Sequence, residues 1–248
     1  MSDPLSSEEI ERYARHLVIK EFGGPGQAKL KAAHVAVVGA GGLGAPCLTY
    51  LAAAGIGKLT IIDDDLVSLS NLQRQVIHQT ARVGQTKTES AIASLKAINP
   101  NVEVVGKNVR MTPDNAADLL ADCTLVIDGS DSFETRATSA AACEQLKVPL
   151  VTAAVSVWDG SLTVLAPHRS KADGTSFPRF TALFPSAPEP GSLPTCAQVG
   201  VVGALTGMLG TMQAMEAVKL LTDAGEPLLG RLLLVDALTM RFETMVYG

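Results

Sequence analysis

Short apolar runs alternate with amphipathic stretches between residues 33 and 155. The apolar runs have the length and composition of buried strands, and the longer stretches have the spacing of helices. Strands are predicted at Val35–Val38, Leu59–Ile62, Val102–Val105, Leu125–Asp128 and Pro149–Ala153, and helices at Leu43–Ala54, Thr86–Ile98, Pro113–Leu120 and Arg136–Leu146. This alternation predicts an α/β fold, with a Rossmann-like, mostly parallel sheet and helices on both of its faces.

The pattern changes on either side of this region. Residues 1–30 are predicted to form a helical arm that ends in a glycine-rich turn at Gly23, Gly24 and Gly26. Residues 31–155 then form the nucleotide-binding region, and residues 156–248 form the C-terminal part of the same domain. That part contains a proline-rich crossover loop, about 167–198, and antiparallel strands that continue the sheet, predicted at Gly160–Ala166, Arg231–Asp236 and Arg241–Val246.

The longest apolar run, Val199–Leu221, has the length of a membrane span. Polar residues recur at every third position within it, at Gln213, Glu216 and Lys219. This stripe favours a buried amphipathic helix, so we expect no membrane association. Three glycines in the same run, Gly203, Gly207 and Gly210, allow a close approach by another helix, either within the chain or in a dimer.

Composition narrows the class of protein. The 248 residues carry a formal charge of -5, so no basic surface for nucleic acid is expected. The four cysteines, Cys47, Cys123, Cys143 and Cys196, are far apart and form no CxxC pair. That spacing fits a reducing cytoplasm and gives no support for a disulfide framework or structural zinc. The N-terminus is polar and contains no signal peptide, which also indicates a cytoplasmic protein.

A glycine motif follows the first predicted strand. Val35–Val38 runs into Gly39-Ala40-Gly41-Gly42-Leu43-Gly44 and a helix, and the next strand ends in Asp63. Glycine permits a tight turn, and the free N–H groups at the helix start favour an anion. Asp63 is placed to accept hydrogen bonds from ribose hydroxyls. The motif alone also occurs as a structural turn, but the order strand, turn, helix and acidic strand end predicts a nucleotide site.

Charged residues downstream of the turn separate ATP from NAD. Arg74, Lys87 and Arg136 supply positive charge, Asp131 follows a predicted strand, and the arm carries Arg12 and Arg15. Hydride transfer needs no such cluster, whereas attack on the α-phosphate of a triphosphate requires neutralisation of the transition state and the departing pyrophosphate. Asp131 is suited to hold Mg²⁺ beside the phosphates. Each charge alone fits a solvated surface or a helix cap; together they favour ATP chemistry.

These residues also carry a resemblance. The chain resembles the MoeB/ThiF family, the ubiquitin-activating-type adenylyltransferases that serve sulfur-carrier proteins. The matching segments cover nearly the whole chain, and the Ser68-Leu69-Ser70-Asn71-Leu72-Gln73-Arg74-Gln75 block is the most specific of them. The others are Arg12–Arg15, Gly39–Gly44, Asp63–Asp65, Gly84–Lys87, Asp128–Asp131, Thr195-Cys196 and Gln213–Lys219.

The resemblance implies an activity and a set of roles. Members bind MgATP and the C-terminal Gly-Gly tail of a ubiquitin-like sulfur carrier, whose carboxylate attacks the α-phosphate to give an acyl-adenylate and pyrophosphate. A sulfur donor then converts the acyl-adenylate to a thiocarboxylate. The implied contacts are, for the phosphates, Gly39, Gly41, Gly42, Gly44, Asn71, Arg74 and Lys87; for the ribose, Asp63 supported by Asp65; and for Mg²⁺, Asp131.

Partners follow from the same resemblance. Arg15 resembles an arginine that reaches the ATP of the other subunit, which implies a homodimer. Cys196 matches a cysteine in a loop that crosses the carrier tail, and in some members this cysteine takes part in covalent or sulfur chemistry. The other interpretation is that Cys196 is a small buried residue. Because no rhodanese domain is present in the sequence, the sulfur is expected from a separate cysteine desulfurase or rhodanese.

The sequence departs from the family pattern at two places. Most relatives bind zinc through two CxxC pairs, but the first falls here at Phe177-Pro178-Arg179-Phe180, so zinc is predicted absent. We expect an apolar contact among Phe177, Phe180 and Phe184 in its place. Ser132 also stands where relatives commonly have asparagine.

Several alternatives stay open. Within the superfamily, the acceptor is either a sulfur carrier, of molybdopterin or thiamine type, or a different group such as a tRNA base or a peptide carboxylate. Outside it, the glycine motif alone also fits an NAD-dependent oxidoreductase or a nucleotide-binding scaffold without chemistry. Retention of Arg74, Lys87 and Asp131 argues against the scaffold.

Overall fold

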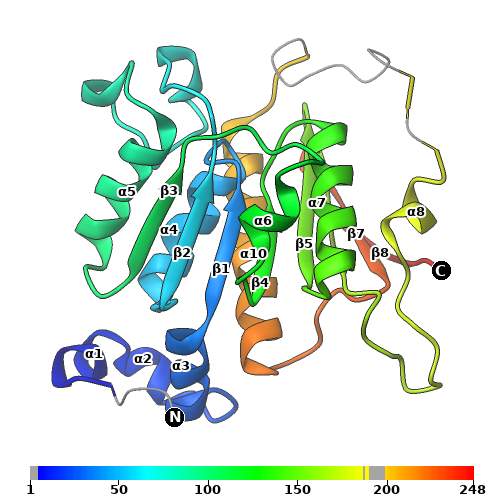
Figure 1. Ribbon diagram of the computed structural model, residues 1–248, viewed down its shortest axis with the longest axis horizontal. Helices are drawn as coiled ribbons and strands as arrows, with labels where there is room; N and C mark the ends of the chain where they lie inside the picture. Colours follow the sequence, from blue (N-terminus) through cyan, green and yellow to red (C-terminus); the bar gives the residue numbers. More distant parts are fainter. Residues whose placement is uncertain (1–4, 187, 190–198) are drawn as a thin grey trace.

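One eight-stranded sheet runs through the computed structural model, which describes residues 5–186, 188–189 and 199–248 (Figure 1). The strand order is β3-β2-β1-β4-β5-β6-β7-β8. The strands are β1 (His34–Val38), β2 (Lys58–Ile62), β3 (Glu103–Lys107), β4 (Leu125–Asp128), β5 (Leu150–Ser156), β6 (Asp159–Leu165), β7 (Arg231–Asp236) and β8 (Arg241–Val246). Neighbours from β3 to β5 pair in parallel, and those from β5 to β8 pair antiparallel. The predicted parallel sheet with an antiparallel continuation is confirmed.

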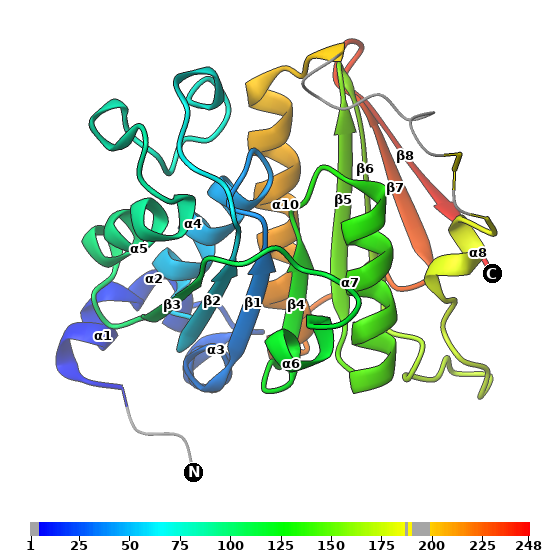
Figure 2. The same cartoon turned by 45° about the horizontal axis from the view of Figure 1, so that its top comes forward.

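Helices cover both faces of the sheet (Figures 1 and 2). They are α1 (Ser7–Arg12), α2 (Ala14–Leu17), α3 (Gly23–Ala32), α4 (Gly44–Ala54), α5 (Lys87–Ile98), α6 (Ala116–Leu120), α7 (Phe133–Leu146), α8 (Phe180–Leu183) and α10 (Gly203–Thr222), with single 3-10 turns at Leu69–Asn71 and Thr80–Arg82. Alternate residues of β1 serve two separate cores. Val35 and Val37 pack in the core shared with α4, α5 and α10, and Ala36 and Val38 pack in the core shared with α6 and α7.

The N-terminal arm differs from the prediction. Gly23, Gly24 and Gly26 do not form a turn that ends the arm; they begin helix α3. Pro25 suits the first helical turn, where its missing N–H is not needed. Gly26 leaves space for the ring of Phe22, because a Cβ there would lie 2.9 Å from Phe22 Cγ. Tertiary packing of α3 therefore overrides the weak helix propensity of glycine.

Two other helices start at different residues from those predicted. Helix α7 begins at Phe133, three residues before Arg136, because the Ser132 side chain accepts a hydrogen bond from the Thr135 N–H and caps it. Helix α10 begins at Gly203 rather than Val199. None of the described helices is long and apolar enough to cross a membrane.

Two of the three polar positions of α10, Gln213 and Glu216, are buried and Lys219 is half-buried, as expected of a helix that packs inside the protein. Gln213 Nε2 donates to the Asp128 carbonyl at 2.6 Å, and Glu216 pairs with Lys219 at 2.5 Å. Gly203 and Gly210 approach segments of the same chain, so internal packing accounts for both. Gly207 has no atom within 4 Å of the place where a Cβ would lie.

The contrast between Gly210 and Gly207 gives a stability test. A Cβ on Gly210 would lie 2.2 Å from the Leu43 carbonyl oxygen and 2.6 Å from Pro46 Cγ, so Gly210→Ala must push α10 away from α4. We expect it to lower the free energy of unfolding by about 1–3 kcal/mol. Gly207→Ala adds no clash and should raise it by about 0.5–1 kcal/mol, the ordinary gain from replacing a helical glycine. Denaturant unfolding of both variants checks this, and equal stabilities would contradict the packing.

Candidate active site

The glycine turn lies at the carboxyl ends of the parallel strands, at the point where the strand order of the sheet reverses. Strand β1 pairs with β2 on one side and with β4 on the other, and ligands bind outside the carboxyl ends of strands at such a point. The turn is tight. Gly39 has φ +90°, and a Cβ on Gly44 would lie 1.9 Å from the Gly39 carbonyl oxygen. Within the described residues, the N–H groups of Gly41 and Gly42 have no protein acceptor, so the start of α4 offers free donors to an anion.

Asp63 lies directly beside this turn. Its carboxylate accepts hydrogen bonds from the N–H of Ala40 at 2.7 Å and the N–H of Asp65 at 2.9 Å. Burial raises the pKa of Asp63, and the nearby Lys87 charge and these two donors oppose that rise. The carboxylate, at the end of β2, therefore holds the backbone at the start of the glycine turn.

Asp65 and Lys87 form an ion pair at the start of α5. Lys87 Nζ lies 2.6 Å from Asp65 Oδ2, and the Lys87 N–H also donates to the Asp65 carbonyl at 2.9 Å. The lysine side chain is only 6% exposed, whereas that of Asp65 is 66% exposed. Thr86 caps the helix by accepting from the Glu89 N–H. The helix start thus holds Lys87 with its ammonium group at the acidic end of β2.

Residues Leu69–Arg74 form the next part of the edge. The Asn71 carbonyl accepts from the N–H groups of Arg74 and Gln75, and Arg74 Nη1 donates to the Ser70 carbonyl at 3.3 Å. The first turn of α10 contacts this segment and the glycine turn together. A Cβ on Gly203 would lie 2.3 Å from the Gln73 carbonyl oxygen, and one on Gly42 would lie 3.1 Å from Thr206. Arg74 is therefore held next to the turn.

Asp131 lies on the loop that follows β4 and touches the turn. A Cβ on Gly39 would lie 3.0 Å from the Gly129 carbonyl oxygen, which shows how closely the two loops meet. Asp131 is exposed, and its carboxylate has no partner among the described residues. One carboxylate beside a polyphosphate is a common way to hold Mg²⁺, so this residue fits that ion. The described residues contain no group of three or more His, Cys, Asp or Glu side chains that would hold a metal alone.

A buried ion pair supports the Asp131 loop. Asp128 is completely buried, and its carboxylate accepts from Arg136 Nε at 3.0 Å, Thr152 Oγ1 at 2.8 Å and Ser130 Oγ at 2.5 Å. Arg136 also donates to the carbonyls of Ser130 and Ala153. The sequence placed Arg136 among the site's cations, but its guanidinium group is bound within the protein. Thr152 was not singled out, because a threonine in an apolar strand has no distinguishing pattern.

One predicted site residue, Arg15, is not at this edge. Arg15 is exposed on α2, in the arm at the opposite end of the strands (Figures 1 and 2). Its neighbour Tyr13 packs against Gly55 at the far end of α4 from the glycine turn. Cys196 lies outside the residues that the structure describes. The other three cysteines are buried, as expected for small apolar side chains.

The region where relatives would bind zinc holds an aromatic cluster. Phe180 and Phe184 lie 4.9 Å apart between ring centroids, and both contact Phe133 of α7. The ring of Phe177 stacks on none of these three rings; together with Pro178 it lies beside Gly230. The expected apolar contact is therefore right for Phe180 and Phe184, and Phe133 takes the place predicted for Phe177. The absence of zinc stays a prediction.

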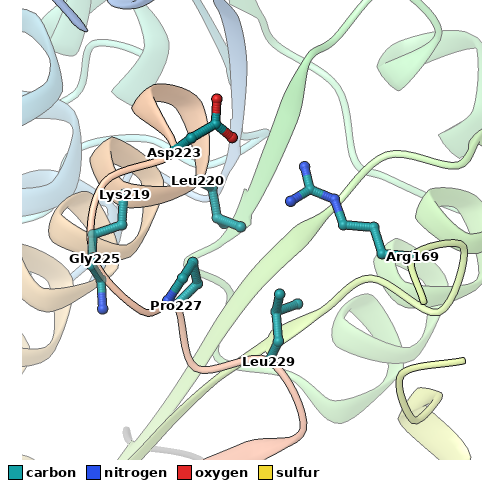
Figure 3. Close-up of a pocket in the computed structure, with 7 residues that line it drawn as sticks. All are labelled: Arg169, Lys219, Leu220, Asp223, Gly225, Pro227 and Leu229. Carbon is teal, nitrogen blue, oxygen red and sulfur yellow. The ribbon is translucent and has the colours of Figure 1, made fainter. Parts of the chain in front are cut away.

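A pocket at the other end of α10 is separate from this site (Figure 3). Arg169 points across it toward Leu220 and Asp223, and Leu229 and Pro227 form its apolar side. Asp223 already pairs with Lys29, and Lys219 pairs with Glu216. The charges on the α10 side of the pocket are thus largely neutralised within the protein.

Comparison with known proteins gives the class. The ThiF family matches residues 13–247. The SAMP-activating enzyme E1 of Haloferax volcanii is 46% identical over 247 residues, covering 100% of this chain and 88% of that protein. The sulfur carrier protein adenylyltransferase of Thermus thermophilus is 43% identical, with 97% and 88% covered. The probable adenylyltransferase/sulfurtransferase MoeZ of Mycobacterium tuberculosis is 44% identical over 97% of this chain, which spans 61% of MoeZ.

Solved structures agree on the fold. The crystal structure of PaaA has a TM-score of 0.81 at 25% identity and covers 100% of this chain and 76% of PaaA. The Escherichia coli MccB structure with ATP has a TM-score of 0.79 at 17% identity, covering 100% of this chain and 80% of MccB. The chain belongs to the ThiF family. It is an enzyme of the adenylyltransferase class, and this class implies ATP as the nucleotide.

The Asp65–Lys87 pair gives a second stability test. Asp65→Ala leaves a nearly buried ammonium group without its partner, and we expect it to lower the free energy of unfolding by about 1–3 kcal/mol. The matched control is Glu103→Ala, which breaks the exposed Lys58–Glu103 pair and should cost about 0–1 kcal/mol. Denaturant unfolding at low and moderate salt measures both. A larger loss in the control would show that Lys87 does not depend on Asp65.

Proposed function

We propose that this enzyme uses MgATP to adenylylate the C-terminal glycine carboxylate of a ubiquitin-like sulfur-carrier protein. The observation that carries the proposal is the convergence of free glycine N–H groups, Arg74, Lys87 and Asp131 at the switch point of the sheet. The names of relatives at 43–46% identity over almost the whole chain support the carrier as the acceptor. Molybdopterin and thiamine routes are both consistent with this chemistry.

The reaction forms one bond and breaks one. A carboxylate oxygen of the carrier attacks the α-phosphorus, and the bond from that phosphorus to the bridging oxygen of pyrophosphate breaks. The glycine-turn N–H groups, Arg74 and Lys87 would balance the negative charge that builds on the phosphates. Asp63 and Asp65 would bind the ribose, and Asn71 would contact the phosphates. Mg²⁺ held by Asp131 would supply further charge neutralisation. The terminal sulfur of a separate persulfide donor would then attack the acyl carbon and displace AMP, and a thiol reductant would cleave the S–S bond of the resulting acyl disulfide to leave the thiocarboxylate.

The site assignment is tested by ATP–pyrophosphate exchange with a candidate carrier ending in Gly-Gly. Asp131→Ala should lower carrier-dependent exchange by about 10²–10³-fold, because the phosphates lose their acidic metal-binding partner. The control is Glu134→Ala, which removes another exposed carboxylate of the same segment and should leave exchange unchanged. Near-normal exchange by Asp131→Ala would remove Asp131 from the mechanism. Exchange that requires no carrier, or a lack of exchange with every carrier tested, would point to a different acceptor.

We also propose that the enzyme works as a homodimer with Arg15 acting on the partner's ATP. Arg15 lies near the far end of α4, and eleven residues of helix span about 16 Å, so its own glycine turn is remote. A two-fold arrangement in which the arm of one copy meets the carboxyl edge of the other would bring the arginine to a phosphate.

Mixed dimers test the trans role directly. Arg15→Ala and Asp131→Ala should each be inactive alone, whereas an equal mixture should regain about one quarter of the wild-type exchange rate, since half of the dimers then contain one complete site. Size-exclusion chromatography checks that the subunits have exchanged. No recovery from mixed dimers would indicate that Arg15 acts within its own chain, and normal exchange by Arg15→Ala alone would show that Arg15 has no role.

A further inference from the structure

His78 is a buried histidine that connects three parts of the site. It follows the Arg74 segment, is only 6% exposed, and its Nε2 lies 3.0 Å from the carbonyl oxygen of Ala40 in the glycine turn. Its Nδ1 lies 2.9 Å from Ser90 Oγ on α5, the helix that begins with Lys87. No motif in the sequence marks this residue as part of the site.

The Ala40 carbonyl fixes the position of one ring hydrogen. A carbonyl oxygen only accepts, so Nε2 carries the hydrogen, and in the neutral ring Nδ1 then accepts from the Ser90 hydroxyl. Burial lowers the pKa of His78; the hydrogen bond to Ala40 opposes this, and the nearby charges of Lys87 and Arg82 lower the pKa further. Arg82 itself is tied to the same helix, because its Nη1 donates to the Ser90 carbonyl and Ser94 Oγ at 2.8 Å.

The Ala40 carbonyl determines where the next N–H points. The described part of the chain contains no cis peptide bond, and in a planar trans peptide the C=O and N–H groups point in opposite directions. Holding the Ala40 oxygen inward against His78 therefore turns the Gly41 N–H outward. That N–H has no acceptor among the described residues. The Ala40 N–H is held as well, by Asp63.

We propose that His78 is a positioning residue: as a hydrogen-bond donor it orients the Ala40–Gly41 peptide so that the Gly41 N–H binds a phosphate of the nucleotide. The proposal rests on the nucleotide site of the proposed function, but it does not depend on the identity of the acceptor. It assigns to His78 an effect on phosphate binding rather than contact with the reacting atoms.

The test separates phosphate binding from nucleoside binding. We would measure the dissociation constants of ATP and adenosine by calorimetry for the wild type, His78→Leu and His78→Gln. Loss of the donor in His78→Leu should weaken ATP about tenfold or more and adenosine less than about twofold. The amide nitrogen of glutamine replaces Nε2–H, so His78→Gln should recover most of the ATP affinity.

His34 provides a matched control. Its ring nitrogens also contact one carbonyl, of Asp122, and one hydroxyl, of Thr60, but at the amino end of the sheet. His34→Leu should lower the melting temperature and leave the ratio of ATP to adenosine affinities unchanged. The proposal would be overturned if His78→Leu left the ratio of ATP to adenosine affinities unchanged, including by weakening both ligands equally. It would also be overturned if His34→Leu changed this ratio as much as His78→Leu does.

The outcomes also distinguish this proposal from the proposed function. If the wild type binds ATP and His78→Leu shifts the ratio, but no carrier supports pyrophosphate exchange, the acceptor assignment fails and the role of His78 stands. If exchange is normal and His78→Leu binds ATP like the wild type, the role of His78 fails alone. Wild-type protein that does not bind ATP would overturn both.

Discussion

The site depends on backbone segments that meet with no side chain between them. Gly44 lies against the Gly39 carbonyl, Gly39 lies against the loop after β4, and Gly203 lies against the carbonyl of Gln73. A Cβ at any of these glycines would fall within about 3 Å of a backbone atom. Because these approaches are so close, the ends of β1 and β4 and the starts of α4 and α10 converge on one small region. The glycine turn and the Arg74 segment lie in this region, and Lys87 is linked to it through its ion pair with Asp65 and the hydrogen bonds of Asp63.

Buried hydrogen bonds then orient the backbone segments that meet at these glycines. Asp63 and His78 hold the two sides of Ala40, and Asp128 binds the loop that carries Asp131. These groups are partly or fully withdrawn from water, so each would be costly without its partner. Among the described residues, the carboxylate of Asp131 and the N–H groups of Gly41 and Gly42 have no partner, which is the arrangement expected at a binding site for a highly charged ligand.

The sequence predicted the elements whose signals are local. The strands near Val35, Leu59 and Leu125, and the helix capped by Thr86, follow from apolar runs and capping residues, and the glycine motif predicted the tight turn between β1 and α4. Helix α3 was missed because its stability comes from packing around Phe22 and Gly26, which no local pattern of residues records.

The sequence also did not predict the parts of the site that depend on contacts between residues far apart in the chain. His78 and Ala40 are distant in sequence, and so are Asp128 and Thr152, so their contacts exist only after the sheet has formed. Composition alone does not indicate which of several cations is left free. Arg136 is bound by Asp128, and the structure alone shows this. The family resemblance implied the roles of the site residues, whereas the structure gave the distances between them.

The pairing of β1 with β4 has a consequence for the order of folding. Val35 pairs with Leu125, so this contact closes a long loop that contains β2, α5 and β3. Loop closure of this kind is slow compared with formation of the β5–β6 and β7–β8 hairpins. The glycine turn and the Asp131 loop lie at the two sides of that late contact. A partly folded chain therefore has the motif without the site, and nucleotide binding begins only when the centre of the sheet is complete.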